Sequence, residues 1–138
     1  MSATVSPAVV ADTHTLIWSM FEPSRLSIAA KMALTNAEAA GAPIYVSSVS
    51  IVELRYLVEK GKFTGDDYDA VLKVLRDPTT APTVFPLNTE AADASKLIAR
   101  TIVPDMPDRI IAATAHHLGL PLVTCDSKIQ SSGIPTIW

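Results

Sequence analysis

Short apolar runs alternate along this chain with longer segments of helical periodicity, and this alternation constrains the fold most. The runs are short and bounded by polar or turn residues, which is typical of strands. Strands separated by helices favour a parallel sheet with helices on its faces. We therefore predict an α/β domain with a central sheet of four to five strands, at residues 7–11, 44–46, 83–87, 121–124 and 134–138.

The helices are predicted from apolar periodicity and from residues typical of helix ends. Ser27 is a suitable N-cap for the second helix and Gly41 a suitable stop. An apolar stripe of Ile28, Met32 and Ala39 is predicted to face the core from this helix. The predicted helices span residues 14–20, 28–40, 48–61 or 50–61, 66–76, 89–100 and 108–118.

Composition narrows the protein class. With 138 residues, 49% of them apolar, and a mean hydropathy of +0.30, the chain can bury the core of a single domain, residues 1–138. No apolar run approaches the roughly 20 residues that a transmembrane helix needs, so no membrane association is expected. The net charge of −3 argues against a broad basic face that grips duplex DNA.

The beginning of the chain and the single cysteine bear on location. Residues 1–10 carry no basic side chain before their apolar residues, unlike a secretory signal. Cys125 is the only cysteine, which excludes an internal disulfide and a thiolate-rich zinc site. Both features predict a cytoplasmic location.

Four acidic residues occupy positions that can converge. Asp12 and Asp126 each follow an apolar strand, where parallel α/β sheets place their ligand crevice. Glu53 lies early in the helix after the second strand, and Asp108 begins another helix. Clustered carboxylates repel one another unless a cation holds them, and Mg²⁺ or Mn²⁺ prefers such oxygen ligands. The pattern predicts a metal site.

Each acid also has a purely structural interpretation. Glu53 completes a capping box with Ser50. Asp105 can cap the helix in which Pro107 takes the first turn, and Asp108 then complements the helix dipole. The two acids that follow strands can serve as ordinary turn or cap residues. Only their joint placement favours a metal site.

Four segments, in this order along the chain, resemble the PIN-domain family, and within it the VapC-type toxins of bacterial toxin–antitoxin pairs. The likeness places the family's signature acids on Asp12, Glu53, Asp108 and Asp126, and it leaves Asp105 as a cap. The segments are Val-Val-Ala-Asp-Thr-His-Thr-Leu-Ile-Trp at 9–18, Val-Ser-Ile-Val-Glu-Leu at 49–54, Pro-Asp-Arg-Ile-Ile-Ala-Ala-Thr-Ala at 107–115, and Leu-Pro-Leu-Val-Thr-Cys-Asp at 120–126.

The resemblance implies a three-layer α/β/α fold and a metal-dependent endoribonuclease that acts as a toxin. It also implies Mg²⁺ or Mn²⁺ as cofactor, a homodimer, and hetero-oligomers with a cognate antitoxin whose C-terminal segment lies over the active site. The metal would activate a water for hydrolysis of RNA phosphodiester bonds. Two alternatives remain open: a PIN-like interaction module with little catalysis, and a metal-dependent nuclease acting on DNA.

Neighbouring residues carry weaker expectations. The hydroxyls of Thr13 and Thr124 can orient a carboxylate or a metal-bound water. Arg109 is expected in a surface ion pair, with a phosphate contact as the alternative. Cys125 is expected to be buried and inert. Two further groups are predicted, an exposed helix end at His116 and His117, and either core packing or a partner surface at Leu16, Ile17, Trp18 and Phe21.

Overall fold

The computed structural model describes residues 7–138 and contains a five-stranded, all-parallel sheet. The prediction about a secretory signal used residues 1–10, so it lies largely outside the described residues. The strand order is β3-β2-β1-β4-β5, with β1 in the middle. The strands are β1 (Val9–Ala11), β2 (Ile44–Ser47), β3 (Pro82–Phe85), β4 (Leu122–Val123) and β5 (Thr136–Ile137).

Helices cover both faces of this sheet, which confirms the predicted α/β architecture. Because side chains alternate along a strand, Val9 and Ala11 pack towards α2, whereas Val10 packs on the opposite face against α6. The helices are α1 (Thr13–Phe21), α2 (Ile28–Ala39), α3 (Ser48–Glu59), α4 (Gly65–Arg76), α5 (Thr89–Asp93), α6 (Met106–Leu118) and α7 (Ser127–Gln130), with 3₁₀ turns η1 (Pro23–Arg25) and η2 (Ala94–Leu97).

The predicted core face of α2 is wrong, although its ends are confirmed. Ser27 caps the helix through Ala30 N at 3.0 Å, and Gly41 follows the helix with a φ of 66°. The predicted stripe of Ile28, Met32 and Ala39 is exposed instead. The buried face consists of Ala30, Leu34 and Ala37. Two small alanines allow the helix to approach the sheet closely, and this outweighs the larger apolar area of the other face.

The helix predicted over residues 89–100 is also wrong in part, because α5 ends at Asp93 and the 3₁₀ turn η2 follows. Beyond this point the carbonyl of Ser95 accepts from the amide of Ile98 at 3.1 Å rather than continuing an α-helical pattern. The same carbonyl accepts from the Arg109 side chain at 2.9 Å. The Ser95 carbonyl is therefore bonded to a side chain of α6 and to a 3₁₀ turn instead of to the next turn of an α-helix.

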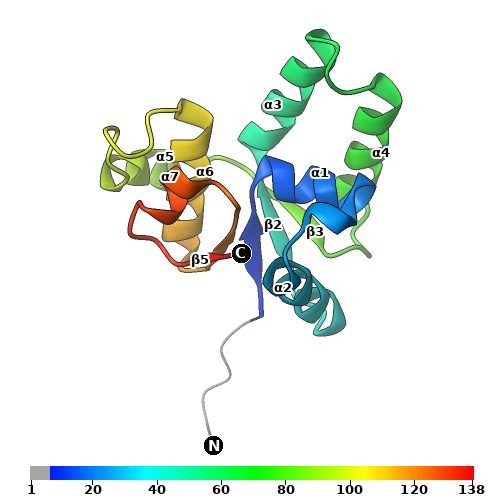
Figure 1. Cartoon of the computed structure of the whole chain (residues 1–138), viewed down its shortest axis with the longest axis horizontal. Coiled ribbons are helices and arrows are strands. Elements are labelled where there is room, and N and C mark those ends of the chain that lie inside the picture. Colours follow the sequence, from blue (N-terminus) through cyan, green and yellow to red (C-terminus); the bar gives the residue numbers. More distant parts are fainter. Residues whose placement is uncertain (1–6) are drawn as a thin grey trace, which may run out of the picture.

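The arrangement leaves an open region where β1 ends. Figure 1 shows α3 and α4 as a helical hairpin on one side of this end, and α5, α6 and α7 on the other. Helix α1 begins between them, directly after β1. Among residues 7–138, none of the helices has the length and apolar character needed to cross a membrane.

Candidate active site

Asp12 connects the central strand to the first helix. It follows β1 and is the N-cap of α1, where its Oδ1 accepts from the amide of Thr15 at 2.8 Å. The residue is only 7% exposed. Its second oxygen, Oδ2, accepts no hydrogen bond from the described residues. The side chain is thus held by one oxygen while the other stays free for a ligand.

Asp126 occupies an equivalent position beside the neighbouring strand. β1 and β4 pair with Ala11 opposite Val123, so the chain leaves both strands at the same edge of the sheet. Asp126 is the N-cap of α7, where its Oδ1 accepts from the amides of Lys128 and Ile129 at 2.9 and 3.0 Å. As at Asp12, only one carboxylate oxygen is used by the fold.

Glu53 is held by a contact between α1 and α3. Its Oε1 accepts from the hydroxyl of Thr13 at 2.6 Å, and the same hydroxyl lies 2.8 Å from the buried hydroxyl of Ser50. The capping-box interpretation is wrong, because Ser47 rather than Ser50 caps α3. The carboxylate of Glu53 is therefore directed by the residue that follows Asp12.

Asp105 and Asp108 lie together at the start of α6. Asp105 caps the helix as predicted, with its Oδ2 accepting from the amide of Asp108 at 3.1 Å. Burial, the charges of Asp105, Asp126 and Glu53, and a hydrogen bond with Asp105 raise the pKa of Asp108 to about 7. In protein without bound metal, the carboxyl group of Asp108 is therefore protonated in a substantial fraction of molecules at neutral pH.

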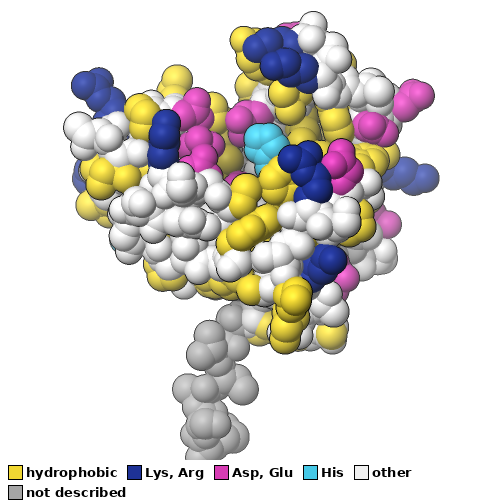
Figure 2. All heavy atoms as spheres, in the orientation of Figure 1, with side chains coloured by type: hydrophobic (Ala, Val, Ile, Leu, Met, Phe, Trp, Pro, Cys, Tyr) yellow, Lys and Arg dark blue, Asp and Glu magenta, His cyan; other side chains and the backbone are white. Residues whose placement is uncertain are grey.

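These acids line one pocket of about 350 Å³. Figure 2 shows acidic side chains beside a histidine in the hollow between the two helical groups. The structure thus brings together all four acids that the sequence indicated, and Asp105 lines the same pocket; the sequence favours Asp105 as a cap but also allows it to face the metal. The pocket is lined by Asp12, Thr13, His14, Trp18, Glu53, Asp105, Asp108, Cys125 and Asp126.

The pocket carries a concentrated negative charge that no lysine or arginine within residues 7–138 neutralises through an ion pair. The ion pairs found within residues 7–138 join Arg25 to Glu22 and Lys96 to Asp93, and neither involves a pocket acid. Burial is also the main cause of a raised pKa at Glu53, although the Thr13 hydrogen bond opposes it. Such an arrangement favours either bound protons or a bound cation.

The donor set fits an oxygen-preferring dication such as Mg²⁺ or Mn²⁺. Asp12 and Asp126 each keep one oxygen free of hydrogen bonds, and the other acids surround the same space. No group of three or more His, Cys, Asp or Glu side chains within residues 7–138 forms a ready metal site. The carboxylate side chains would therefore have to move closer together to enclose an ion.

Two neighbouring residues, Arg109 and Cys125, differ from their expected roles. Arg109 makes neither the predicted surface ion pair nor a pocket contact; its guanidinium donates to the carbonyls of Ser95 and Ile98. The hydroxyl of Thr124 accepts from the backbone amide of Asp126 at 3.0 Å, and its action on a metal-bound water stays a prediction. Cys125 is exposed and lines the pocket, because β4 ends at Val123 and the chain has already left the sheet.

The remaining expectations have mixed outcomes. His116 and His117 are exposed at the end of α6, as predicted. Leu16 is buried in the core, whereas Trp18 is partly exposed and lines the pocket. Phe21 is 36% exposed. The first helix thus contributes both to the core and to an accessible surface.

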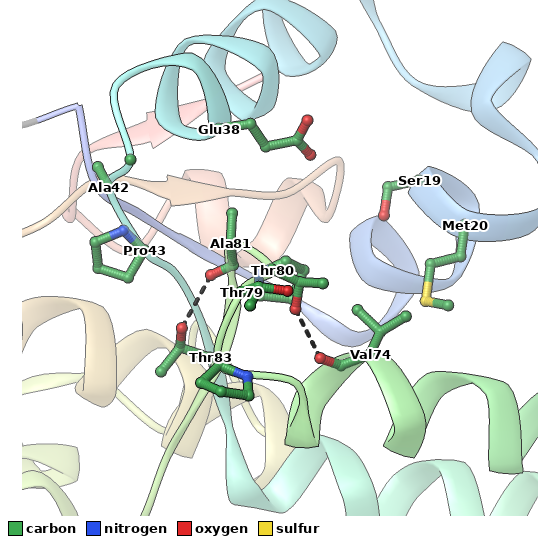
Figure 3. Close-up of a pocket in the computed structure, with 13 residues that line it drawn as sticks. Ser19, Met20, Glu38, Ala42, Pro43, Val74, Thr79, Thr80, Ala81 and Thr83 are labelled. Carbon is green, nitrogen blue, oxygen red and sulfur yellow. Dashed lines mark hydrogen bonds between the residues drawn. The ribbon is translucent and has the colours of Figure 1, made fainter.

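A larger pocket, of about 620 Å³, lies elsewhere. Figure 3 shows it where the end of α2, the loop after α4 and the start of β3 meet. Among the described residues that line it, Glu38 alone is acidic. The hydroxyls of Thr80 and Thr83 donate to the backbone carbonyls of Val74 and Ala81 at 2.7 and 2.9 Å. This pocket has no cluster of reactive groups, so the carboxylate pocket is the candidate active site.

Fold and site together define a parallel α/β domain with an acidic pocket at the carboxyl ends of its central strands. The chain belongs to the PIN domain family, whose model matches residues 9–133. It is 29% identical over 133 residues to Ribonuclease VapC22 of Mycobacterium tuberculosis, which covers 94% of this chain and 98% of that protein.

Solved structures confirm the fold. VapBC2 from Rickettsia felis, bound to a DNA fragment from its promoter, matches with a TM-score of 0.69 at 16% identity, over 94% of this chain and 96% of that one. DNA-bound VapBC from Salmonella typhimurium matches with a TM-score of 0.65 at 20% identity, over the same shares of the two chains. A toxin–antitoxin complex from Klebsiella pneumoniae gives 0.63 at 22% identity, again over 94% and 96%.

Proposed function

We propose that this protein is a divalent-metal-dependent endoribonuclease of the VapC type, which hydrolyses RNA phosphodiester bonds. One observation carries the proposal: five carboxylates from four segments line one pocket, and within residues 7–138 none of them forms an ion pair with lysine or arginine. The similarity to a ribonuclease over nearly the whole length of both chains supports RNA as the substrate. The net charge of −3 supports a local contact with nucleic acid rather than a broad one.

The residues of the pocket have different proposed roles. Asp12 and Asp126 would hold Mg²⁺ or Mn²⁺ through their free oxygens, and Asp108 would join them after releasing its proton. When bound, such an ion supplies Lewis acidity that neutralises phosphate charge and lowers the pKa of a bound water. Glu53, held by Thr13, is placed to contribute a further ligand or to accept a proton from the attacking water.

We further propose that the ribonuclease acts as the toxin of a toxin–antitoxin pair. Solved VapBC structures with the same fold, and a structure described as a toxin–antitoxin complex, support an antitoxin as partner. A homodimer that binds antitoxin as a hetero-oligomer, located in the cytoplasm, fits this role. Growth arrest on induced expression, relieved by co-expression of the protein encoded beside it, would support the role.

The activity is tested with purified protein, total RNA, and Mg²⁺, Mn²⁺ or EDTA. We expect metal-dependent fragments with 5′-phosphate ends. Asp12→Asn should fold normally, since Asn is as good an N-cap as Asp. Its rate of RNA cleavage should fall by about a hundredfold or more, because a metal ligand is lost. Asp66→Asn, which removes an exposed acid from the first turn of α4, is the matched control and should cleave at the parent rate.

The alternatives give different results in the same experiment. An interaction module would bind RNA or protein and release no fragments with any metal. A DNA nuclease would cut single-stranded or flap DNA and leave RNA intact. Equal cleavage by Asp12→Asn and the parent protein would refute the assignment of the site.

A further inference from the structure

A cluster of aromatic and basic side chains adjoins the carboxylate pocket. His14 and Trp18 lie one turn apart on α1, with ring centroids 5.6 Å apart. The guanidinium carbon of Arg25 lies 4.3 Å from the centroid of the Trp18 ring, and Trp138 packs against Trp18 at 5.9 Å. We call the surface of His14, Trp18 and Arg25 the aromatic face.

The aromatic face connects two cavities. His14 and Trp18 line the carboxylate pocket, and both also line a neighbouring pocket of about 470 Å³. This second pocket lies between α1, η1 and the segment joining α3 to α4, with Arg25 and Lys62 on its wall. A ligand that extends out of the carboxylate pocket along α1 therefore crosses the aromatic face.

The chemistry of this face favours unpaired nucleobases. Bases that are not paired in a duplex stack on aromatic rings and on the guanidinium plane of arginine. Arg25 and Lys62 offer contacts to phosphate, but Glu22 and Asp67 line the same pocket and Glu22 pairs with Arg25 at 3.4 Å. The two basic and two acidic side chains of this pocket balance in charge. Base stacking rather than a run of phosphate contacts must therefore provide most of the affinity for a nucleic-acid strand.

We propose that the aromatic face binds the single-stranded RNA that flanks the bond cut in the carboxylate pocket. Bases stack on His14 and Trp18, and Arg25, ordered by its contact with Trp18, binds a base or a phosphate. The inference rests on the proposed ribonuclease function and adds to it a preference for unpaired nucleotides beside the cleavage point.

The two tryptophans of the chain, Trp18 and Trp138, give a direct spectroscopic test. In Trp138→Phe the remaining indole fluorescence comes from Trp18 alone. We expect a short single-stranded oligoribonucleotide of mixed sequence to quench this fluorescence in Ca²⁺, with gels verifying that the probe stays intact. The same strand annealed to its complement should quench far less, because its bases are already stacked and paired.

Matched substitutions measure the contribution of each side chain. Arg25→Gln and His14→Ala should each weaken binding of the single strand about fivefold to tenfold. Arg55→Gln is the control, because Arg55 is also exposed and also lies over an aromatic ring, that of Tyr68 at 5.0 Å, but lines neither pocket. Thermal unfolding verifies that each variant is folded.

The results separate this inference from the proposed function. Metal-dependent RNA cleavage without quenching of Trp18, or with unchanged binding by Arg25→Gln and His14→Ala, would overturn the inference and leave the ribonuclease intact. Quenching by the single strand and its loss in those variants, without cleavage in any metal, would support the binding face while refuting the nuclease. Equal quenching by duplex and single strand would also overturn the inference.

Discussion

The hydroxyl of Thr13 lies 2.6 Å from Oε1 of Glu53, so the residue after Asp12 orients a carboxylate that belongs to a different helix. Asp12 caps α1, and its position there fixes Thr13 in the first turn of that helix. One segment of chain therefore supplies a candidate metal ligand directly and positions a second through a hydrogen bond.

Thr13→Val should remove the positioning of Glu53 while leaving Asp12 in place as a candidate ligand. Valine has nearly the shape of threonine but cannot donate to Glu53, so we expect RNA cleavage and Mn²⁺ affinity to fall about tenfold to a hundredfold. The pKa of Glu53 should rise further, because the Thr13 hydrogen bond lowers it in the parent protein. Cleavage rates across a Mn²⁺ titration provide the measurement.

Ser50→Ala is the control for Thr13→Val. It removes the other partner of the Thr13 hydroxyl while the Thr13–Glu53 contact remains, so its activity should fall much less. Full activity in Thr13→Val would show that Glu53 needs no such support.

Asp108 should make the metal-free protein less stable as pH rises. Its pKa of about 7 lies above the usual value of 3.8, so between these values the folded state binds more protons than the unfolded chain. Stability contributed by the protonated form is complete below about pH 4 and is lost as pH rises through about 7. Asp108→Asn removes this dependence.

We therefore expect Asp108→Asn to exceed the parent in free energy of unfolding by about 1–2 kcal/mol near pH 8, after allowing for solvent screening. Near pH 4 the two proteins should be equally stable. Urea unfolding in EDTA at both pH values provides the measurement, and the surface variant Asp66→Asn should show no such gain. A parent protein as stable as the variant near pH 8 would contradict the raised pKa of Asp108, which burial and the neighbouring acids cause.

Added Mn²⁺ should stabilise the protein most where the carboxylates are ionised. Protons compete with the metal for Asp108 and Glu53, so the rise in Tm should be larger near pH 8 than near pH 5.5. Each tenfold increase in free metal above its dissociation constant should add about 1.4 kcal/mol to the free energy of unfolding. A pH-independent shift, or none, would argue against a carboxylate site; Asp12→Asn should show a reduced shift.

The parallel sheet and the acids that follow its strands could be predicted because each strand is marked by a short apolar run in the sequence. Strands buried on both faces read as continuous apolar runs, and Asp12 follows such a run directly. The parallel pairing of β1 with β4 then places Asp126 at the same edge. The two acids therefore meet because each directly follows its strand and these two strands pair in parallel.

The features that the sequence did not predict depend on packing between segments that are far apart in the chain. The buried face of α2 is set by how closely Ala30 and Ala37 approach the sheet, and not by which face carries more apolar area. Likewise, the bond from Thr13 to Glu53 spans 40 residues. Cys125 is predicted to be buried from its place next to an apolar run, but β4 ends at Val123 and the side chain is exposed.

Arg109 shows how such packing supports the site from outside it. The residue follows Asp108, and its side chain donates to the carbonyls of Ser95 and Ile98 at 2.9 and 3.2 Å. These bonds tie the start of α6 to the turn η2. Arg109→Gln should therefore lower the free energy of unfolding by about 2 kcal/mol, since a charged donor to two carbonyls is lost.

Arg109→Lys should not restore this stability, because an ammonium group lacks the planar fork that reaches both carbonyls. Urea unfolding gives the comparison, with the exposed Arg100→Gln as a control for loss of one positive charge. RNA binding per folded molecule should stay within about twofold of the parent, because Arg109 lines no part of the carboxylate pocket. Weaker RNA binding with unchanged stability would instead assign Arg109 to phosphate contact, the role that the structure argues against.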